Sequence, residues 1–147
     1  MPDTPDSPSP ETLIAFDFGL RRIGVAVGQN ITGSAQPLGS VANGSSPDWP
    51  RLDRLLDEWR PARLVVGMPL HTDGSRTDMT AAVDTFVRAL GRYGLPVETI
   101  DERYSSLEAE AMLVARRKLG MTGRIRKEMI DAAAAVLIAE RWLANAK

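Results

Sequence analysis

Acidic residues interrupt three otherwise apolar segments of the sequence. Asp17 lies near the end of the run LIAFDFG, Asp101 and Glu102 follow the run VETI, and Asp131 starts an apolar row of the last predicted helix. A carboxylate among apolar residues needs a partner, because removing an unpaired charge from water costs several kcal/mol. A shared divalent cation would satisfy these carboxylates. Oxygen ligands without cysteine, and with a single histidine, favour Mg²⁺ or Mn²⁺ over zinc.

Such an acidic site has a known use in phosphoryl transfer, where two metal ions about 3.5–4 Å apart stabilise the attacking and the leaving oxygen. Each acid also has a structural explanation. Asp17 could accept hydrogen bonds from the backbone of the glycine-containing turn after it, and Asp131 could favour the positive end of a helix dipole. Asp101 could be a turn residue, and Glu102 could pair with Arg103. The combination favours a metal site more than any single position does.

Basic residues accompany the acids along the chain. Arg21 and Arg22 follow Asp17, and Arg103 follows Glu102. A segment without acids, residues 111–127, contains the remaining candidates: Arg116, Arg117, Lys118, Arg124, Arg126 and Lys127. Lys and Arg hold phosphates in nucleic-acid complexes, so this combination predicts a nuclease. The alternative is a solvated helix end, where basic residues suit the dipole; it explains Arg116 to Lys118 better than the second cluster.

The bulk composition excludes several other classes of protein. The 147 residues have a net charge of −1 and no cysteine, so disulfides and thiolate metal ligands are absent, and any nucleic-acid-binding surface must be local. No apolar run has membrane length and no signal-peptide pattern is present, so we expect a cytoplasmic protein that does not enter a membrane. His71, the only histidine, lies in a polar loop, where it could act as an acid or base or be a simple loop residue.

Apolar periodicity predicts the elements that position these residues. Residues 1–12, rich in Pro, Asp and Ser, predict a disordered tail, and residues 13–147 predict a single domain. Strands are predicted at 13–18, 22–27, within 31–41 with a bend near Gly33 and Pro37, at 63–68 and at 97–100; helices are predicted at about 52–59, 83–90, 105–119 and 128–144. Three antiparallel strands followed by βαβ crossovers predict an α/β fold with one mixed five-stranded sheet flanked by helices.

Four motifs in this order resemble the YqgF family, also called RuvX, of bacterial Holliday-junction-resolvase-like proteins. They are DFGLRRIGVAVG, VVGMPLHTDGS, DERYSSLEAE and KEMIDAAAAVLIAE. The resemblance implies a ribonuclease H-like fold and a metal-dependent endonuclease that processes the 5′ end of the 16S ribosomal RNA precursor or cleaves branched DNA. It assigns Asp17 as the first-strand acid, one of Asp101 and Glu102 as the second, and Asp131 as the third. Strand alternation points Asp101 and Glu102 to opposite sides and does not decide between them.

Two other functions are also compatible with the sequence. A non-catalytic ribosome-maturation factor would use the basic segment to bind nucleic acid without cleaving it. An actin-like ATPase would use the DxG turn, here Asp17-Phe18-Gly19, to hold phosphate, although such enzymes close two lobes around the nucleotide. The sequence also leaves open whether the substrate is RNA or DNA. A homodimer is possible, since cleavage of a two-fold junction calls for a symmetric enzyme.

Overall fold

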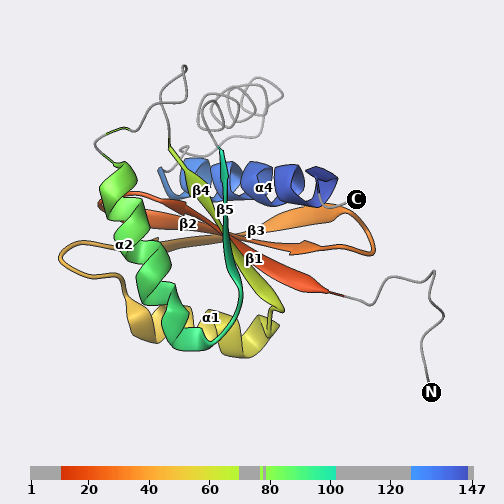
Figure 1. Cartoon of the computed structure of the whole chain (residues 1–147), viewed down its shortest axis with the longest axis horizontal. Helices are drawn as coiled ribbons and strands as arrows, with labels where there is room; N and C mark the ends of the chain where they lie inside the picture. The colour runs from red at the N-terminus through yellow and green to blue at the C-terminus, as the bar shows by residue number, and fades with distance from the viewer. Residues whose placement is uncertain (1–10, 70–76, 78, 102–126, 146–147) are drawn as a thin grey trace.

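The computed structural model describes residues 11–69, 77, 79–101 and 127–145, with side chains in the last range described from residue 132 onward. Its strands form one sheet in the order β3-β2-β1-β4-β5 (Figure 1). The strands are β1 (Thr12–Phe18), β2 (Arg22–Gln29), β3 (Ser34–Ala42), β4 (Arg63–Met68) and β5 (Val97–Asp101). The first three are antiparallel, whereas β4 runs parallel to β1 and β5 parallel to β4. This confirms the predicted α/β fold with a mixed five-stranded sheet.

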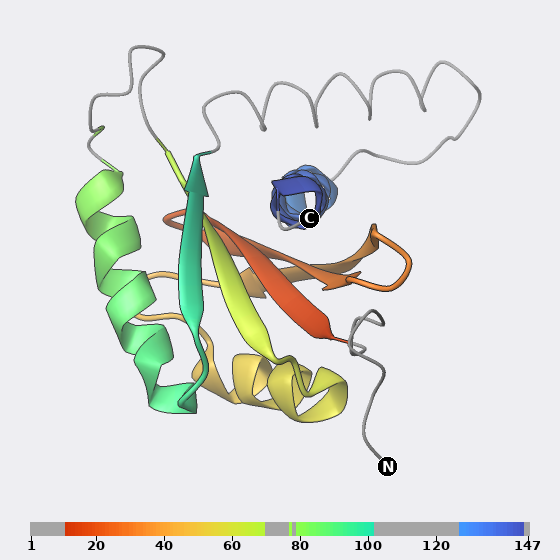
Figure 2. The same ribbon diagram turned by 45° about the vertical axis from the view of Figure 1, so that its right-hand side comes forward.

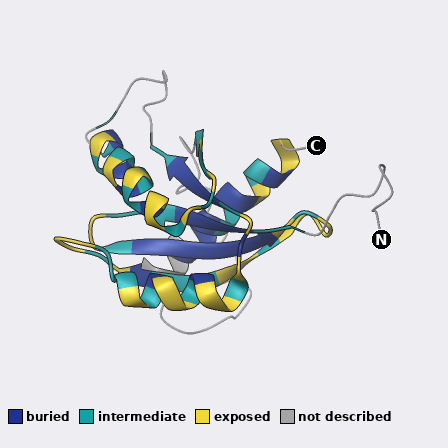
Figure 3. Cartoon of the chain, turned by 60° about the horizontal axis from the view of Figure 1, so that its bottom comes forward, coloured by how far each residue is buried: buried dark blue, intermediate teal, exposed yellow. Residues whose placement is uncertain are grey.

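Helices cover both faces of the sheet. α1 (Trp49–Trp59) and α2 (Thr80–Leu90), which continues into the short 3-10 helix η1 (Gly91–Tyr93), lie on one face, and α4 (Lys127–Asn145) lies on the other (Figures 1 and 2). The outward sides of α1 and α2 are exposed and the central strands are buried (Figure 3). The helix predicted at 105–119 lies outside the described residues. No helix in the described part of the chain is long and apolar enough to span a membrane.

The predicted boundaries shift by a few residues where capping or turn geometry decides them. α1 begins before its apolar stripe, because the Asp48 side chain accepts a hydrogen bond from the Arg51 backbone N–H at 3.2 Å. β3 is continuous from Ser34, and the predicted bend near Pro37 is a register shift opposite Val25 and Ala26. Pro37 fits there because β3 is an edge strand, where a missing backbone N–H is tolerated.

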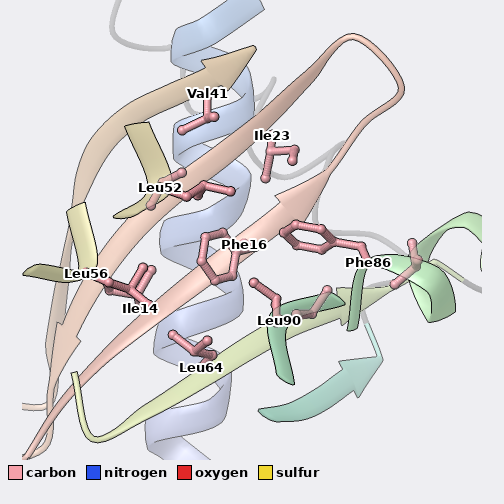
Figure 4. Close-up of a cluster of buried hydrophobic side chains, with 12 residues drawn as sticks. Ile14, Phe16, Ile23, Val41, Leu52, Leu56, Leu64, Phe86 and Leu90 are labelled. Carbon is pink, nitrogen blue, oxygen red and sulfur yellow. The ribbon is translucent and has the colours of Figure 1, made fainter. Parts of the chain in front are cut away.

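Alternation along β1 divides the apolar core into two layers. Ile14 and Phe16 pack against α1 and α2, and the Phe16 ring meets Phe86 edge-on with centroids 5.5 Å apart (Figure 4). Leu13 and Ala15 pack instead with Ile138 and its neighbours in α4. Because side chains alternate along a strand, the next residue in the second series, Asp17, belongs to the α4 face.

α4 approaches the sheet closely over Gly28 of β2. A Cβ at Gly28 would lie 3.2 Å from Leu143 Cδ1, 3.4 Å from Ala139 Cβ and 3.4 Å from Leu13 Cγ. The end of α4 therefore lies over the start of β1, and the two elements run in opposite directions. The start of α4 consequently lies at the carboxyl end of β1, as Figure 1 shows.

The opposite end of the sheet is held together by Arg63, the first residue of β4. Its guanidinium forms ion pairs with Glu11, just before β1, and with Glu98 of β5 at 2.8 Å. These carboxylates raise the pKa of Arg63 above its ordinary value. The same group lies 4.9 Å from the ring centroid of Trp142 in α4. The folded part of the chain thus includes Glu11 and Thr12, the last two residues of the segment predicted as a tail.

Candidate active site

Asp17 is the penultimate residue of β1 and lies opposite Gly24 of β2. It is half-buried, next to the fully buried Phe16, on the face covered by α4. The sequence places it there because an apolar strand leads directly into a tight turn at Gly19. A Cβ at Gly19 would lie only 2.6 Å from the carbonyl oxygen of Arg22, so no other residue fits this turn without a backbone shift.

Asn43, which the sequence reasoning missed, fixes this turn. Its side-chain amide donates a hydrogen bond to the Gly19 carbonyl at 2.7 Å, and its backbone N–H donates to the Arg21 carbonyl at 2.9 Å. Asn43 follows β3 in a segment predicted only as a loop. The Asn-Gly pair it forms with Gly44 marks a turn, but nothing local indicates a contact with residues 24 positions away.

Asp101 ends β5 and pairs with Met68 at the end of β4. The carboxyl ends of the parallel strands β1, β4 and β5 therefore meet at one edge, as the sequence predicts for Asp17 and Asp101. The two residues differ in face. Ile100 packs in the α4 layer and Val97 in the α1 and α2 layer, so alternation assigns Asp101 to the face opposite Asp17.

Arg141 of α4 contacts the end of β5 directly. Its guanidinium donates a hydrogen bond to the Asp101 backbone carbonyl at 2.7 Å. This carbonyl belongs to the peptide bond that leads into Glu102. The helix that contains Asp131 is thereby attached to the strand that precedes Glu102.

Asp131 lies in α4, as predicted, and is the fifth residue of that helix. Helical spacing puts position 131 in one row with Ala134, Ala135 and Ile138, all of them fully buried. The position thus belongs to the side of α4 that faces the sheet, near the carboxyl end of β1. The Asp131 side chain itself is outside the described set.

The predicted basic residues are only partly within the described structure. Arg21 is exposed on the turn after Asp17, and Arg22 is half-buried at the start of β2. Outside the described residues or side chains lie Glu102, His71, Arg103, Arg116, Arg117, Lys118, Arg124, Arg126 and Lys127. Of the four predicted acids, the structure describes the side chains of Asp17 and Asp101. Among all the side chains that it describes, no three potential ligands lie close enough together to form a metal-binding group.

Comparison with known proteins extends over most of the chain. A family model described as RuvX, Holliday junction resolvase, matches residues 11–145. A candidate pre-16S rRNA nuclease of Azotobacter vinelandii is 46% identical over 138 residues, which cover 92% of this chain and 95% of that protein. A protein of Burkholderia lata with the same name is 49% identical over 134 residues, 90% of this chain and 88% of its own.

Two solved structures share the fold at low sequence identity. Thermus thermophilus RuvC in complex with a Holliday junction substrate has a TM-score of 0.53 at 18% identity and covers 92% of this chain and 95% of its own. The yeast mitochondrial Holliday junction resolvase Ydc2 has a TM-score of 0.53 at 10% identity, and the match covers 89% of this chain and 77% of its own. With the family match and the relatives at nearly half identity, this shows that the chain belongs to the RuvX family of nucleases and has a ribonuclease H-like fold.

Proposed function

We propose that this protein is a metal-dependent endonuclease that trims the 5′ end of the 16S ribosomal RNA precursor in the cytoplasm. The observation that supports this best is the position of Asp17. It is a half-buried carboxylate at the carboxyl end of the central strand β1, on the face where α4 starts. Exposed Arg21 follows on the next turn. We infer the substrate from the names of relatives of similar length, which are candidate pre-16S rRNA nucleases.

We propose that the acidic residues at this end of the sheet hold a magnesium or manganese site of the two-metal type. Asp17 belongs to the α4 face, and position 131 belongs to the side of α4 that faces the sheet. Alternation along β5 assigns Asp101 to the other face. We therefore propose Asp17, Glu102 and Asp131 as the ligands, and Asp101 as a residue outside the metal set. When bound, such ions activate water and stabilise charge on the phosphate.

The other residues hold the acids and the substrate in place. Arg21 and Arg22, at the turn after Asp17, bind phosphates of the strand being cut, assisted by Arg103 and the basic residues at 116–127. The two hydrogen bonds from Asn43 hold this turn, and Arg141 holds the strand end before Glu102. A rigid frame matters because a small displacement of a reacting group costs a large factor in rate.

Branched DNA is the second candidate substrate, because RuvC, which shares the fold, was solved with a Holliday junction. A cleavage assay with both substrates distinguishes them. The protein is incubated in Mg²⁺ or Mn²⁺ with one of two labelled substrates, a precursor RNA fragment or a four-way DNA junction. We expect defined cleavage of the RNA by a monomer; symmetric cleavage of the junction by a homodimer would favour the resolvase function. Salt-sensitive binding of both without cleavage would favour a non-catalytic maturation factor.

A further inference from the structure

A groove of about 330 Å³ opens beside the turn that follows Asp17, on the α1 and α2 face of the sheet. Phe18 and Leu20 line it from the strand end and the turn. Ala82 and Phe86 line it from α2, and the loop between β3 and α1 completes it. Three segments distant in sequence thus form a single concave site beside the turn that follows Asp17, on the face of the sheet opposite that acid.

The lining is apolar with a polar edge. The walls contain aromatic, leucine and alanine side chains, and Ser45, Ser46 and Thr85 add hydroxyl groups that can donate or accept hydrogen bonds. Leu20 is 62% exposed, and among the described residues the only other exposed large hydrophobic side chain is Ile31, at 57%. An exposed leucine at the mouth of an apolar groove gains free energy when a flat apolar group covers it.

The size and the charge of the groove limit its ligand. A volume of about 330 Å³ lies at the lower end of the range for small-molecule sites, roughly 300–1,000 Å³, so a single ring system fits better than a peptide helix. No charged residue lines the groove, which favours an uncharged ring over a phosphate or a metal ion as its ligand. A nucleobase has the matching chemistry: two apolar faces and an edge of hydrogen-bonding groups. Arg21, exposed beside Leu20, supplies a cation for the neighbouring phosphate.

We propose that this groove binds one unpaired base of the substrate, from a nucleotide that flanks the cleavage site. The inference rests on the proposed nuclease function and adds a determinant of substrate choice to it. The base leaves its stack and inserts between Leu20 and the wall formed by α2, as flipped bases do in other enzymes. The backbone of that nucleotide then crosses the turn formed by Gly19 to Arg21. This turn directly follows Asp17 and Phe18, the last two residues of β1. Duplex RNA is disfavoured at the cleavage site because its bases are not available to the groove.

Two variants of α2 test the groove. Ala82→Phe fills it, and Ala81→Phe is the matched control, because Ala81 is exposed on the same helix and does not line the groove. The substrates are precursor RNA fragments with one abasic nucleotide moved through the positions that flank the cleavage site. We expect one abasic position to lower kcat/KM of the wild type about 10-fold, given the usual contribution of base stacking. Ala82→Phe should lower kcat/KM for unmodified RNA to the same extent. On the sensitive abasic substrate, Ala82→Phe should cause no further loss of kcat/KM. Ala81→Phe should have the kcat/KM of the wild type on both substrates.

Leu20→Ala provides a second variant at an exposed position, and it should likewise affect intact RNA and spare the abasic substrate. Additive effects of Ala82→Phe and the abasic site, or no sensitive position, would overturn the proposal. A binding readout separates this failure from failure of the nuclease function. Asp17→Asn is mixed with RNA that has 2-aminopurine at successive positions. Quenching at one position that Ala82→Phe abolishes supports the groove even if no RNA is cut; cleavage by wild type without such quenching refutes the groove alone.

Discussion

The side-chain amide of Asn43 donates a hydrogen bond to the carbonyl of Gly19 at 2.7 Å, and this contact joins the end of β3 to the turn after Asp17. The Asn43 side-chain oxygen accepts a hydrogen bond from the Gly44 backbone N–H at 2.9 Å, which fixes the orientation of the amide. The turn is thus held from outside its own hairpin. The turn that follows Asp17 is therefore held by an uncharged residue from another strand end.

Replacing Asn43 by alanine should therefore lower kcat about 10-fold, because a small displacement of the acid affects the chemical step. The free energy of unfolding should fall by about 1–2 kcal/mol, because the side chain takes part in two hydrogen bonds, each of which usually contributes about 1 kcal/mol. Asn30→Ala is the matched control. The Asn30 side chain accepts a hydrogen bond from the Glu11 backbone at 2.7 Å, at the opposite end of β1. It should lose similar stability and keep its kcat; an unchanged kcat in Asn43→Ala would contradict the positioning role.

Arg141→Met tests the connection between α4 and the end of β5. Loss of the hydrogen bond to the Asp101 carbonyl should raise the Mn²⁺ concentration needed for half-maximal cleavage several-fold, because the following residue, Glu102, is a proposed ligand. RNA affinity measured in Ca²⁺ should stay unchanged. Arg54→Met, at an exposed position of α1, is the control. Equal metal dependence in the wild type and Arg141→Met would show that Arg141 does not position the end of β5 for metal binding.

The sequence predicted the parts of this structure that follow from local patterns. The apolar run before Gly19 indicated β1 and the unusual place of Asp17, and the spacing of Leu52 and Leu56 indicated α1. α2 begins at Thr80, three residues earlier than predicted. Thr80 lies on the buried face of the helix, but it is polar, so the apolar pattern in the sequence starts only at Val83.

Contacts between distant segments could not be predicted in this way. The bond from Asn43 to Gly19 and the bond from Arg141 to Asp101 join residues 24 and 40 positions apart. The proposal of Glu102 rather than Asp101 as a metal ligand likewise rests on a contact that the sequence does not give, the packing of Ile100 in the α4 layer. The groove beside Phe18 is formed by three segments, and none of them alone has the pattern of a binding site.

Gly28→Val should destabilise the protein by about 2 kcal/mol, because a side chain at this point collides with Leu143 and forces α4 away from β2. Urea unfolding measures the effect. Gly91→Ala is a suitable control, since a Cβ at Gly91 meets no atom within 4 Å and its φ is −57°. Similar losses of stability in the two variants would show that α4 does not depend on close packing at Gly28.

Tyr93 makes stability depend on pH in the alkaline range. Burial, followed by the hydrogen bond that its hydroxyl donates to Asp53 at 2.6 Å, raises the pKa of Tyr93 above its ordinary value of about 10. Because the pKa is raised in the folded state, the protonated Tyr93 hydroxyl stabilises the fold. This contribution to the free energy of unfolding is complete below pH 10 and is lost as the pH rises beyond 10. Urea unfolding between pH 9 and pH 11.5 should therefore show a steeper loss for the wild type than for Tyr93→Phe. Parallel curves would contradict the assignment.

We propose that Asp17 belongs to a nuclease centre, and the rate of single-turnover cleavage of the precursor RNA by Asp17→Asn checks this assignment. The substitution keeps the shape of the side chain and removes its charge. We expect the cleavage rate in Mn²⁺ to fall on the order of 1,000-fold, while the Kd for the RNA stays within about 2-fold of wild type. A rate within about 10-fold of wild type would show that the carboxylate of Asp17 does not take part in the reaction.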